Sequence, residues 1–205
     1  HAALIGSICH RVLEGWDFHG SPQELQRSVE SVVKWATTFG KGEVKSPAQF
    51  QGEGFAYQGE SISHPYEGGD AGEVIKPQFS PFNTLQTQDA EFIKAEVLKI
   101  LSNFTGSEAY KELQNAQILG REIPILLKWN GQIMRGTIDI LYKTDNRLII
   151  ADYKTDHVKP SDLQARAEKY QHQKEVYIEA VKRCLKIDNP EFKLIFLRLG
   201  KAISI

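Results

Sequence analysis

Two aspartates and one lysine lie at the ends of neighbouring apolar runs, where they can form a site for a divalent cation. Asp139 ends the run 136–139, and Asp152 and Lys154 stand two residues apart directly after the apolar run 148–151. Converging carboxylates repel one another unless a cation lies between them, and carboxylate, carbonyl and water ligands suit Mg²⁺ or Mn²⁺. The alternative is an exposed strand face with a surface ion pair, the usual meaning of an isolated Asp-x-Lys sequence.

Three consecutive strands are predicted to carry these residues. Asn130-Gly131 predicts a two-residue hairpin turn between the first two strands, because both residues tolerate positive φ angles. Residues 143–146 predict a four-residue loop before the third strand. The apolar run 148–151 is typical of a strand buried on both faces, and polar side chains at its end indicate a site at the edge of a sheet.

The predicted four-residue loop fixes a register between the second and third strands. Tyr142 would pair with Arg147, and Asp139 would lie opposite Ile150, which makes Asp152 the diagonal neighbour of Asp139 on the same face. A slip of one residue would turn Asp139 to the other face. The cation site therefore depends on this register.

An amphipathic helix is predicted at the N-terminus, because apolar residues recur at helical spacing over 4–16. His10 lies away from the centre of the apolar stripe, next to Gly6 one turn earlier. By position alone His10 is predicted to be an exposed histidine, and the small Gly6 leaves room beside it.

Further helices and one more strand follow from periodicity and capping residues. Ser161 is predicted to cap a long helix that places Tyr170, Gln173 and Tyr177 on one face. An amide in the middle of such a stripe needs hydrogen-bond partners, which singles out Gln173. The other elements are a helix over 22–39 with the capping box Ser21-Pro22-Gln23-Glu24, a helix over 92–104, a short helix from Ser107 through Leu113, and a last strand over 193–199.

These sequences resemble the nuclease domain of RecB- and AddA-type helicase–nucleases, the C-terminal domain of a UvrD/Rep-like motor in the PD-(D/E)xK superfamily. The resemblance implies an α/β fold with a restriction-endonuclease-like core, whose mixed sheet is flanked by helices and preceded by a helical part. It rests on four motifs in family order: His10-Arg11-Val12-Leu13-Glu14, Gly136-Thr137-Ile138-Asp139, Asp152-Tyr153-Lys154-Thr155, and Tyr170-x-x-Gln173-x-x-x-Tyr177.

The expected organisation is a single nuclease domain over 1–205, with a mainly helical part at 1–106 and a catalytic α/β core at 107–205. A glycine-rich insertion at 40–84 interrupts the helical part. Its aromatic residues can stack on single-stranded DNA, but a segment that packs on the surface is the favoured interpretation.

The resemblance implies a metal site. Mg²⁺, with Mn²⁺ as the alternative, would be held by His10, Asp139, Asp152 and the backbone carbonyl of Tyr153. The histidine at this position is a metal ligand in RecB-like nucleases, which replaces the interpretation of His10 as a surface residue. The ion would polarise the scissile phosphate and lower the pKa of a bound water, and one well-held ion is favoured over two.

The remaining site residues are assigned from the same resemblance. Lys154 would position the attacking water and stabilise developing negative charge. Gln173 and Tyr177 would face the active site, where they contact the DNA backbone or order Lys154. Glu122 would hold the metal shell or orient a ligand, and the alternative is a surface residue beside Arg121.

Composition restricts the compartment and the cofactors. The chain has 205 residues, 41% of them hydrophobic, and no apolar stretch long enough for a membrane span, so no membrane partner is expected. Two cysteines, Cys9 and Cys184, are too few for a four-cysteine iron–sulfur cluster or a disulfide framework, which indicates a cytoplasmic protein. The net charge is −1, although Lys and Arg outnumber Asp and Glu by 13 to 9 from residue 143 onward.

The expected function is that of a metal-dependent DNA exonuclease in an ATP-dependent helicase–nuclease that acts in double-strand-break repair and recombination. The expected partners are single-stranded or duplex DNA ends, helicase domains of the same parent chain, and a second helicase–nuclease subunit. The alternative is an inactive nuclease fold that binds DNA or serves as a scaffold. The presence of every ligand and of Lys154 counts against that alternative.

Overall fold

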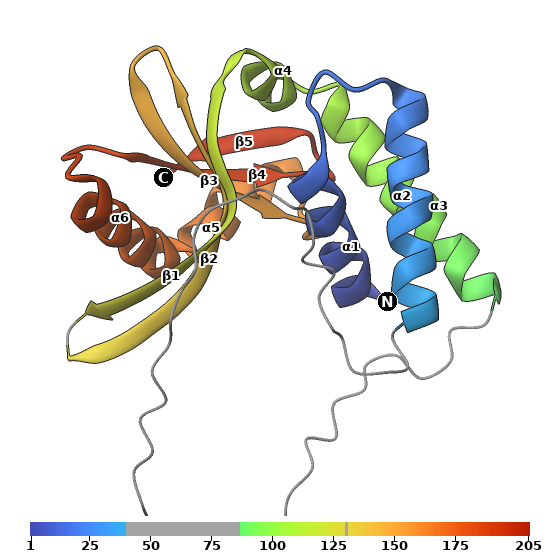
Figure 1. Ribbon diagram of the computed structural model, residues 1–205, viewed down its shortest axis with the longest axis horizontal. Coiled ribbons are helices and arrows are strands. Elements are labelled where there is room, and N and C mark those ends of the chain that lie inside the picture. The colour runs from blue at the N-terminus through green and yellow to red at the C-terminus, as the bar shows by residue number, and fades with distance from the viewer. Residues whose placement is uncertain (40–86, 130) are drawn as a thin grey trace, which may run out of the picture.

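The computed structural model describes residues 1–39, 87–129 and 131–205. A five-stranded sheet in these residues separates two groups of helices (Figure 1). Neighbouring strands pair antiparallel, except that β3 and β4 pair parallel. The strands follow the order β1 (Gln117–Trp129), β2 (Gln132–Thr144), β3 (Arg147–Lys154), β4 (Glu191–Phe196) and β5 (Lys201–Ser204). The mixed sheet flanked by helices confirms the predicted fold class.

One group of helices contains α1 (Ala2–Gly15), α2 (Pro22–Phe39), α3 (Thr87–Thr105) and α4 (Glu108–Asn115). The other contains α5 (Leu163–Glu168) and α6 (Gln171–Leu185), which form the crossover from β3 to β4. No helix in the described ranges is long and apolar enough to cross a membrane. The glycine-rich segment 40–84 lies outside the described residues, so both predictions for it stay predictions.

Strand β3 is buried on both faces, as its apolar run predicts. Ile149 belongs to the core under α1–α4, and Ile150 belongs to the core under α5 and α6. Both side chains are completely buried, and burial of each contributes about 1.5–3 kcal/mol. The polar end of β3 is thereby held between two packed layers.

Two predicted helix caps are present. The Ser21 backbone N–H donates to Glu24 Oε2 at 2.6 Å, and the Glu24 N–H donates to Ser21 Oγ at 3.3 Å, which completes a capping box before α2. Ser107 Oγ accepts from the Tyr110 N–H at the start of α4. These side chains satisfy backbone donors that the first turn of a helix leaves unpaired.

The predicted register of the second hairpin is wrong. The loop contains two residues, Asp145 and Asn146, with φ angles of +46° and +62°, so that Tyr142 pairs with Ile149. Asp and Asn tolerate positive φ at both positions, and such a tight turn matches the twist of the flanking strands. The last pair is Ile140 with Ala151. Asp139 and Asp152 are the next residues along the two strands, directly beyond the last pair.

The predicted long helix from Ser161 is also wrong. Residues 160–162 form a 3₁₀ turn that begins at Pro160, and α5 ends at Glu168 before α6 starts at Gln171. Ser161 therefore caps neither helix, and Tyr170 occupies the N-cap position of α6. The strand predicted over 193–199 corresponds to β4, which starts at Glu191 and ends at Phe196. The short strand β5, which follows a turn through Gly200, was not predicted.

Candidate active site

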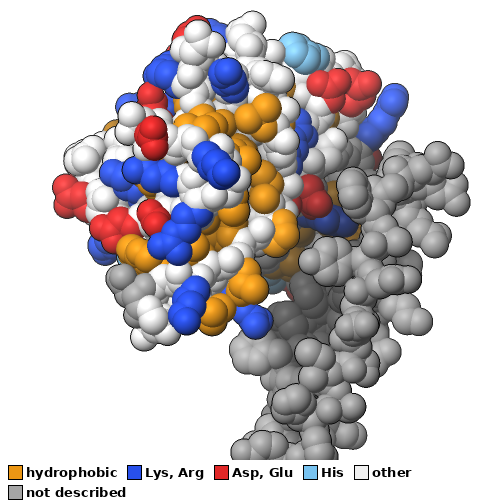
Figure 2. Space-filling model, turned by 60° about the vertical axis from the view of Figure 1, so that its left-hand side comes forward, with side chains coloured by type: hydrophobic (Ala, Val, Ile, Leu, Met, Phe, Trp, Pro, Cys, Tyr) orange, Lys and Arg blue, Asp and Glu red, His pale blue; other side chains and the backbone are white. Residues whose placement is uncertain are grey.

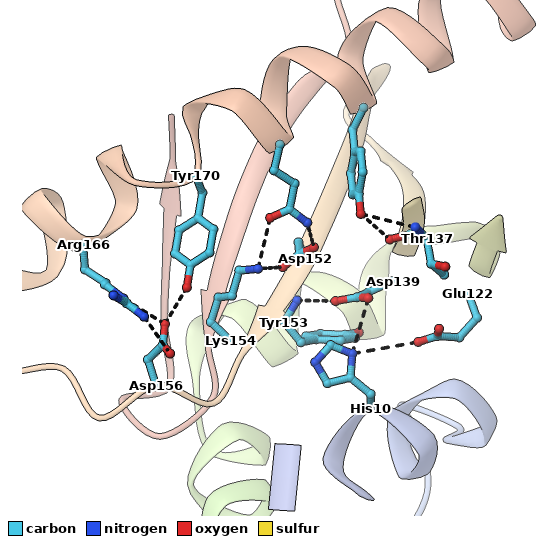
Figure 3. Close-up of polar contacts among 12 residues, drawn as sticks. His10, Glu122, Thr137, Asp139, Asp152, Tyr153, Lys154, Asp156, Arg166 and Tyr170 are labelled. Carbon is cyan, nitrogen blue, oxygen red and sulfur yellow. Dashed lines mark hydrogen bonds and ion pairs between the residues drawn. The ribbon is translucent and has the colours of Figure 1, made fainter. Parts of the chain in front are cut away.

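The two carboxylates that stand out in the sequence are both buried where β2 and β3 meet. Asp139 is 7% exposed and Asp152 is 3% exposed. The Tyr153 backbone N–H donates to Asp139 Oδ2 at 2.6 Å, which ties the side chain from β2 to the backbone of β3 (Figure 3). Burial of two acidic groups is costly unless each is paired, so their partners define the site.

Asp139 faces two further potential ligands, and we call His10, Glu122 and Asp139 the metal half of the site. His10 Nδ1 lies 3.3 Å from Asp139 Oδ1 and 4.0 Å from Glu122 Oε1. One ligand atom from each of the three residues lies within 4.8 Å of the others. His10 comes from α1, Glu122 from β1 and Asp139 from β2, so three separate elements converge (Figure 3).

Arg121 explains how α1 reaches the sheet. Its guanidinium donates to the backbone carbonyls of Leu13, Glu14 and Trp16 at the end of α1. Cationic side chains satisfy the unpaired carbonyls that a helix presents at its C-terminus. Arg121 thus fixes α1 against β1.

Glu122 follows with a φ of +46°, between the ladder pairs of its two neighbours. A non-glycine residue in this region of φ is uncommon and costs about 1–3 kcal/mol. The Glu122 side chain is about one third exposed and its carboxylate faces His10, while Arg121 binds the end of α1.

Asp152 is held by a second set of partners, and we call Asp152, Lys154 and Gln173 the lysine half. Lys154 Nζ lies 2.5 Å from Asp152 Oδ2, and it donates to Gln173 Oε1 at 3.1 Å. The Gln173 amide in turn donates to Asp152 Oδ1. Gln173 thus bridges the carboxylate and the ammonium, which gives the central amide of α6 the partners that its position requires.

Tyr177 packs against β2 beside the lysine half. Its hydroxyl donates to the Thr137 carbonyl at 2.7 Å and accepts from the Thr137 N–H at 3.3 Å. A Cβ atom at Gly136 would lie 2.8 Å from the Tyr177 ring. The glycine therefore permits the close approach of α6 to β2, and Tyr177 anchors that approach.

Burial and mutual repulsion raise the proton affinity of the site. Desolvation, together with the charge of Asp139, raises the pKa of Asp152 to about 6, although Lys154 opposes the shift. Desolvation and the charge of Asp139 also raise the pKa of Glu122. Burial of His10 disfavours imidazolium, but the hydrogen bond and charge of Asp139 outweigh it and raise the pKa of His10. The site carries excess negative potential, which a cation relieves.

The donor set of the metal half fits a divalent cation. The two carboxylates suit Mg²⁺ or Mn²⁺, and the imidazole supplies a third donor. An open pocket lined by Gly6, Ser7, His10, Arg11, Glu14 and Glu122 leads to this half. Gly6 also lets α1 approach the loop that follows β3, because a Cβ atom at Gly6 would lie 3.0 Å from Thr155 Oγ1.

The predicted residues thus separate into two groups. His10, Asp139 and Glu122 come together, whereas Asp152 is occupied by the lysine half. A ligand role for Asp152 and for the Tyr153 carbonyl stays a prediction. Sequence reasoning missed two other residues: Asp156, which accepts two hydrogen bonds from Arg166 at 3.1 Å each and one from Tyr170, and Arg166 itself. Ten residues separate them, so no local spacing could reveal the pair.

Curated relatives share part of this chain. It is 32% identical over 119 residues to an ATP-dependent helicase/nuclease protein of Streptococcus suis, covering 55% of this chain and 9% of that protein. It is 34% identical over 109 residues to the protein of the same name from Streptococcus mutans, covering 50% and 9%. It is 32% identical over 120 residues to the exonuclease/helicase protein RexA of Streptococcus pneumoniae, covering 55% and 10%. The chain spans about a tenth of the length of these relatives.

The family match covers nearly all of the sequence. The model of the PD-(D/E)XK nuclease superfamily matches residues 1–203. That range includes every element of the site, from the histidine on α1 to the glutamine on α6. With its mixed sheet and its buried Asp-x-Lys at the end of β3, the chain belongs to the PD-(D/E)XK nuclease superfamily.

Proposed function

We propose that this chain is the nuclease domain of an ATP-dependent helicase–nuclease and that it hydrolyses DNA phosphodiester bonds as a metal-dependent exonuclease. The observation that carries the proposal is the pairing of Lys154 with buried Asp152, directly beside Asp139 and its two potential co-ligands. A buried ion pair is weak evidence for stability, because removing two charges from water is costly. A role in chemistry accounts for its presence.

His10, Glu122 and Asp139 would hold the cation, with Asp152 and the Tyr153 carbonyl as further proposed ligands. A bound divalent cation would supply Lewis-acid polarisation of the scissile phosphate and an acidified water. Of the two ions, Mg²⁺ is the proposed resident and Mn²⁺ the substitute.

Lys154 is the proposed catalytic cation of the protein itself. Its side chain is 16% exposed, so the ammonium lies in a poorly hydrated place where it interacts strongly with developing negative charge. Gln173 holds it by accepting one hydrogen bond and holds Asp152 by donating another. We expect Lys154 to orient the attacking water and stabilise the phosphate oxygens, and Tyr177 to keep α6 at the correct distance.

The proposed partners are DNA ends, the helicase domains of a longer parent chain in the cytoplasm, and a second helicase–nuclease subunit. The names of the relatives support the first two proposals. An apolar surface supports a protein neighbour. Figure 2 shows hydrophobic side chains gathered among Lys and Arg on the face of β1 and α6, where Leu126 is 69% exposed and Leu185 is 47% exposed.

An inactive scaffold is the alternative function. It requires no cation and no working Lys154, and it predicts that substitution of Asp152 leaves every biochemical property except stability unchanged. The potential ligands His10, Glu122 and Asp139 are all present, and so are Asp152 and Lys154, which gives this alternative no specific support.

Cleavage of end-labelled DNA tests the proposal. The chain, Asp152→Ala and the control Asp188→Ala, an exposed carboxylate on the loop after α6, are incubated with single-stranded and duplex DNA labelled at either end, in Mg²⁺, Mn²⁺ or EDTA. We expect metal-dependent degradation by the chain and by Asp188→Ala, and loss of degradation in Asp152→Ala. Equal cleavage by all three proteins would exclude the assignment. If no protein cleaves, failure to bind metal in calorimetry would favour the scaffold, whereas metal binding would favour a nuclease that needs its helicase to deliver the DNA.

A further inference from the structure

Tyr170 contacts the ammonium of Lys154 with the face of its ring. Lys154 Nζ lies 4.0 Å from the centroid of the Tyr170 ring. A cation at this distance over an aromatic face is attracted by the ring quadrupole, more strongly where water is excluded. The ammonium is thus held by Asp152, by Gln173 and by an aromatic face (Figure 3).

The Tyr170 ring is itself held at its far end. Its hydroxyl donates to Asp156 Oδ2 at 2.7 Å, and the Asp156 carboxylate accepts a fork of two hydrogen bonds from Arg166. Burial opposes ionisation of Asp156, but the hydrogen bonds from Arg166 and Tyr170 lower its pKa. Burial, followed by the contact with Asp156, raises the pKa of Tyr170 to about 12. The phenol therefore remains a donor and the carboxylate an acceptor at neutral pH.

The interruption between α5 and α6 places these three residues. Arg166 lies on α5, and Tyr170 is the N-cap residue of α6, one turn before Gln173. Asp156 follows β3, two residues after Lys154. A chain of contacts therefore runs from Arg166 to Asp156, to Tyr170 and to Lys154, alongside the direct bond from Gln173.

We propose that Tyr170 is a positioning residue for Lys154, whose ring holds the ammonium in place while Asp156 and Arg166 hold the ring. The inference rests on the proposed catalytic role of Lys154. A lysine side chain has four rotatable bonds. One hydrogen bond and one ion pair can be satisfied in more than one side-chain conformation, so they do not fix the position of the ammonium by themselves. The aromatic face removes that freedom, and supporting contacts of this kind keep a reacting group within its productive geometry.

The placement is tested without any activity measurement. The chain is labelled with ¹³C at the lysine Cε, and the Lys154 resonance is assigned by its absence from Lys154→Arg. We expect the Lys154 ε-protons to be shifted upfield by the ring current of Tyr170. The shift should be lost in Tyr170→Leu, retained in Tyr170→Phe, and unaffected in Phe92→Leu, an aromatic residue of α3 that is 54% exposed. A wild-type resonance at the position of an exposed lysine would overturn the proposal.

Cleavage kinetics test the consequence. Tyr170→Leu should lower kcat by about 2- to 30-fold, the range that a cation–π contact supports, while KM for DNA changes little. Tyr170→Phe should recover most of the loss, because it keeps the ring. Equal kcat in Tyr170→Leu and wild type would overturn the proposal, as would a loss seen only in KM.

A pair of milder variants keeps the test available if Tyr170→Leu does not fold. Tyr170→Phe and Asp156→Asn both disrupt the contact between the hydroxyl and the carboxylate, so the double variant should lose no more activity than the more affected single variant. Additive losses would show that the contact does not act on Lys154. Absence of cleavage by the wild-type chain would instead count against the proposed function, while the resonance shift would still decide where the ring lies.

Discussion

The two halves of the active site differ in how fully their polar atoms are paired within the protein. In the lysine half, Lys154 Nζ forms an ion pair with Asp152 Oδ2 and donates to Gln173 Oε1, and the Gln173 amide donates to Asp152 Oδ1. In the metal half, three potential ligand atoms lie within 4.8 Å of one another. His10 and Glu122 there are each about one third exposed. One half contains its own cation, and the other is arranged to receive one.

The two buried aspartates of the site therefore have different proposed roles: Asp139 as a metal ligand and Asp152 as the partner of Lys154. Asp139 and Asp152 start from the same residue type, at adjacent places on adjacent strands. Asp152 faces α6, which supplies an amide, while β3 supplies the ammonium partner. Asp139 faces α1, which supplies an imidazole that remains accessible through the pocket at His10. The partner that each helix supplies, the Gln173 amide from α6 or the His10 imidazole from α1, thus distinguishes the two aspartates.

The largest expected effect is a loss of cleavage without a loss of metal binding, which would assign different functions to the two halves. Lys154→Met should reduce cleavage by about 10²–10⁴-fold, the cost of losing a positioned electrostatic group, because the aliphatic replacement carries no charge. Binding of Mn²⁺, followed by calorimetry, should be retained, because no ligand of the metal half changes. Lys182→Met, an exposed lysine of α6, is the matched control. Loss of metal binding in Lys154→Met would show that the halves are not separable.

The next effect concerns stability without metal. Asp152 titrates near pH 6 in the folded chain and near 3.8 when unfolded, so the folded state binds the extra proton between these values and its stability falls as pH rises through them. The total change is about 3 kcal/mol, from about 1.4 kcal/mol per pKa unit. Asp152→Asn, which cannot ionise, should flatten this part of the profile.

Thermal unfolding in EDTA between pH 4 and 7 checks this. Asp188→Asn should follow the wild-type profile. The raised pKa of His10 adds a decline of the same sign above its unfolded value of 6.5. Asp152→Asn should reduce that part without removing it, because the hydrogen bond and charge of Asp139 raise the pKa of His10 more than the charge of Asp152 does. Parallel profiles for wild type and Asp152→Asn would mean that burial of Asp152 carries no proton-linked cost.

A smaller effect isolates the metal half. Glu122→Gln keeps the shape of the side chain but removes its charge, and it should weaken Mn²⁺ binding by about 10- to 100-fold, the range seen when one contributor to a metal site is altered. The ε-proton resonance of Lys154 should stay unchanged. Unaltered Mn²⁺ affinity would place Glu122 outside the ligand set. Glu14→Gln, on the rim of the same pocket, controls for general electrostatic attraction.

The smallest effect concerns the close packing of Tyr177 against Gly136, beside the lysine half. Gly136→Ala places a Cβ atom about 2.8 Å from the Tyr177 ring, which must shift, and overpacking of this kind costs about 1–3 kcal/mol. Unfolding by denaturant should show the loss, and Gly136→Ala/Tyr177→Leu should recover part of it. Gly15→Ala, where no atom lies within 4 Å of the added Cβ, should not be destabilised by such a contact.

Much of the fold follows from local sequence signals. The capping box before α2, the Ser107 cap of α4 and the apolar run of β3 are read over four to eight residues, and strands and helices form from interactions over the same range. Gln173 stands out because an amide in an apolar stripe needs partners. The break between α5 and α6 was not predictable, because residues 163–185 satisfy helical periodicity throughout and the contact of Tyr170 with Asp156 is not local.

The sequence by itself determined which chemical groups are available: two carboxylates, a lysine, a histidine and an amide, in an order typical of one nuclease superfamily. Only the tertiary structure decided which carboxylate meets which cation. The two-residue turn at Asp145 and Asn146 sets Asp139 beside Asp152, and the helices α1 and α6 approach them from different sides. Charge pairing depends on distances of a few ångströms between elements far apart in sequence, and those distances are fixed by packing.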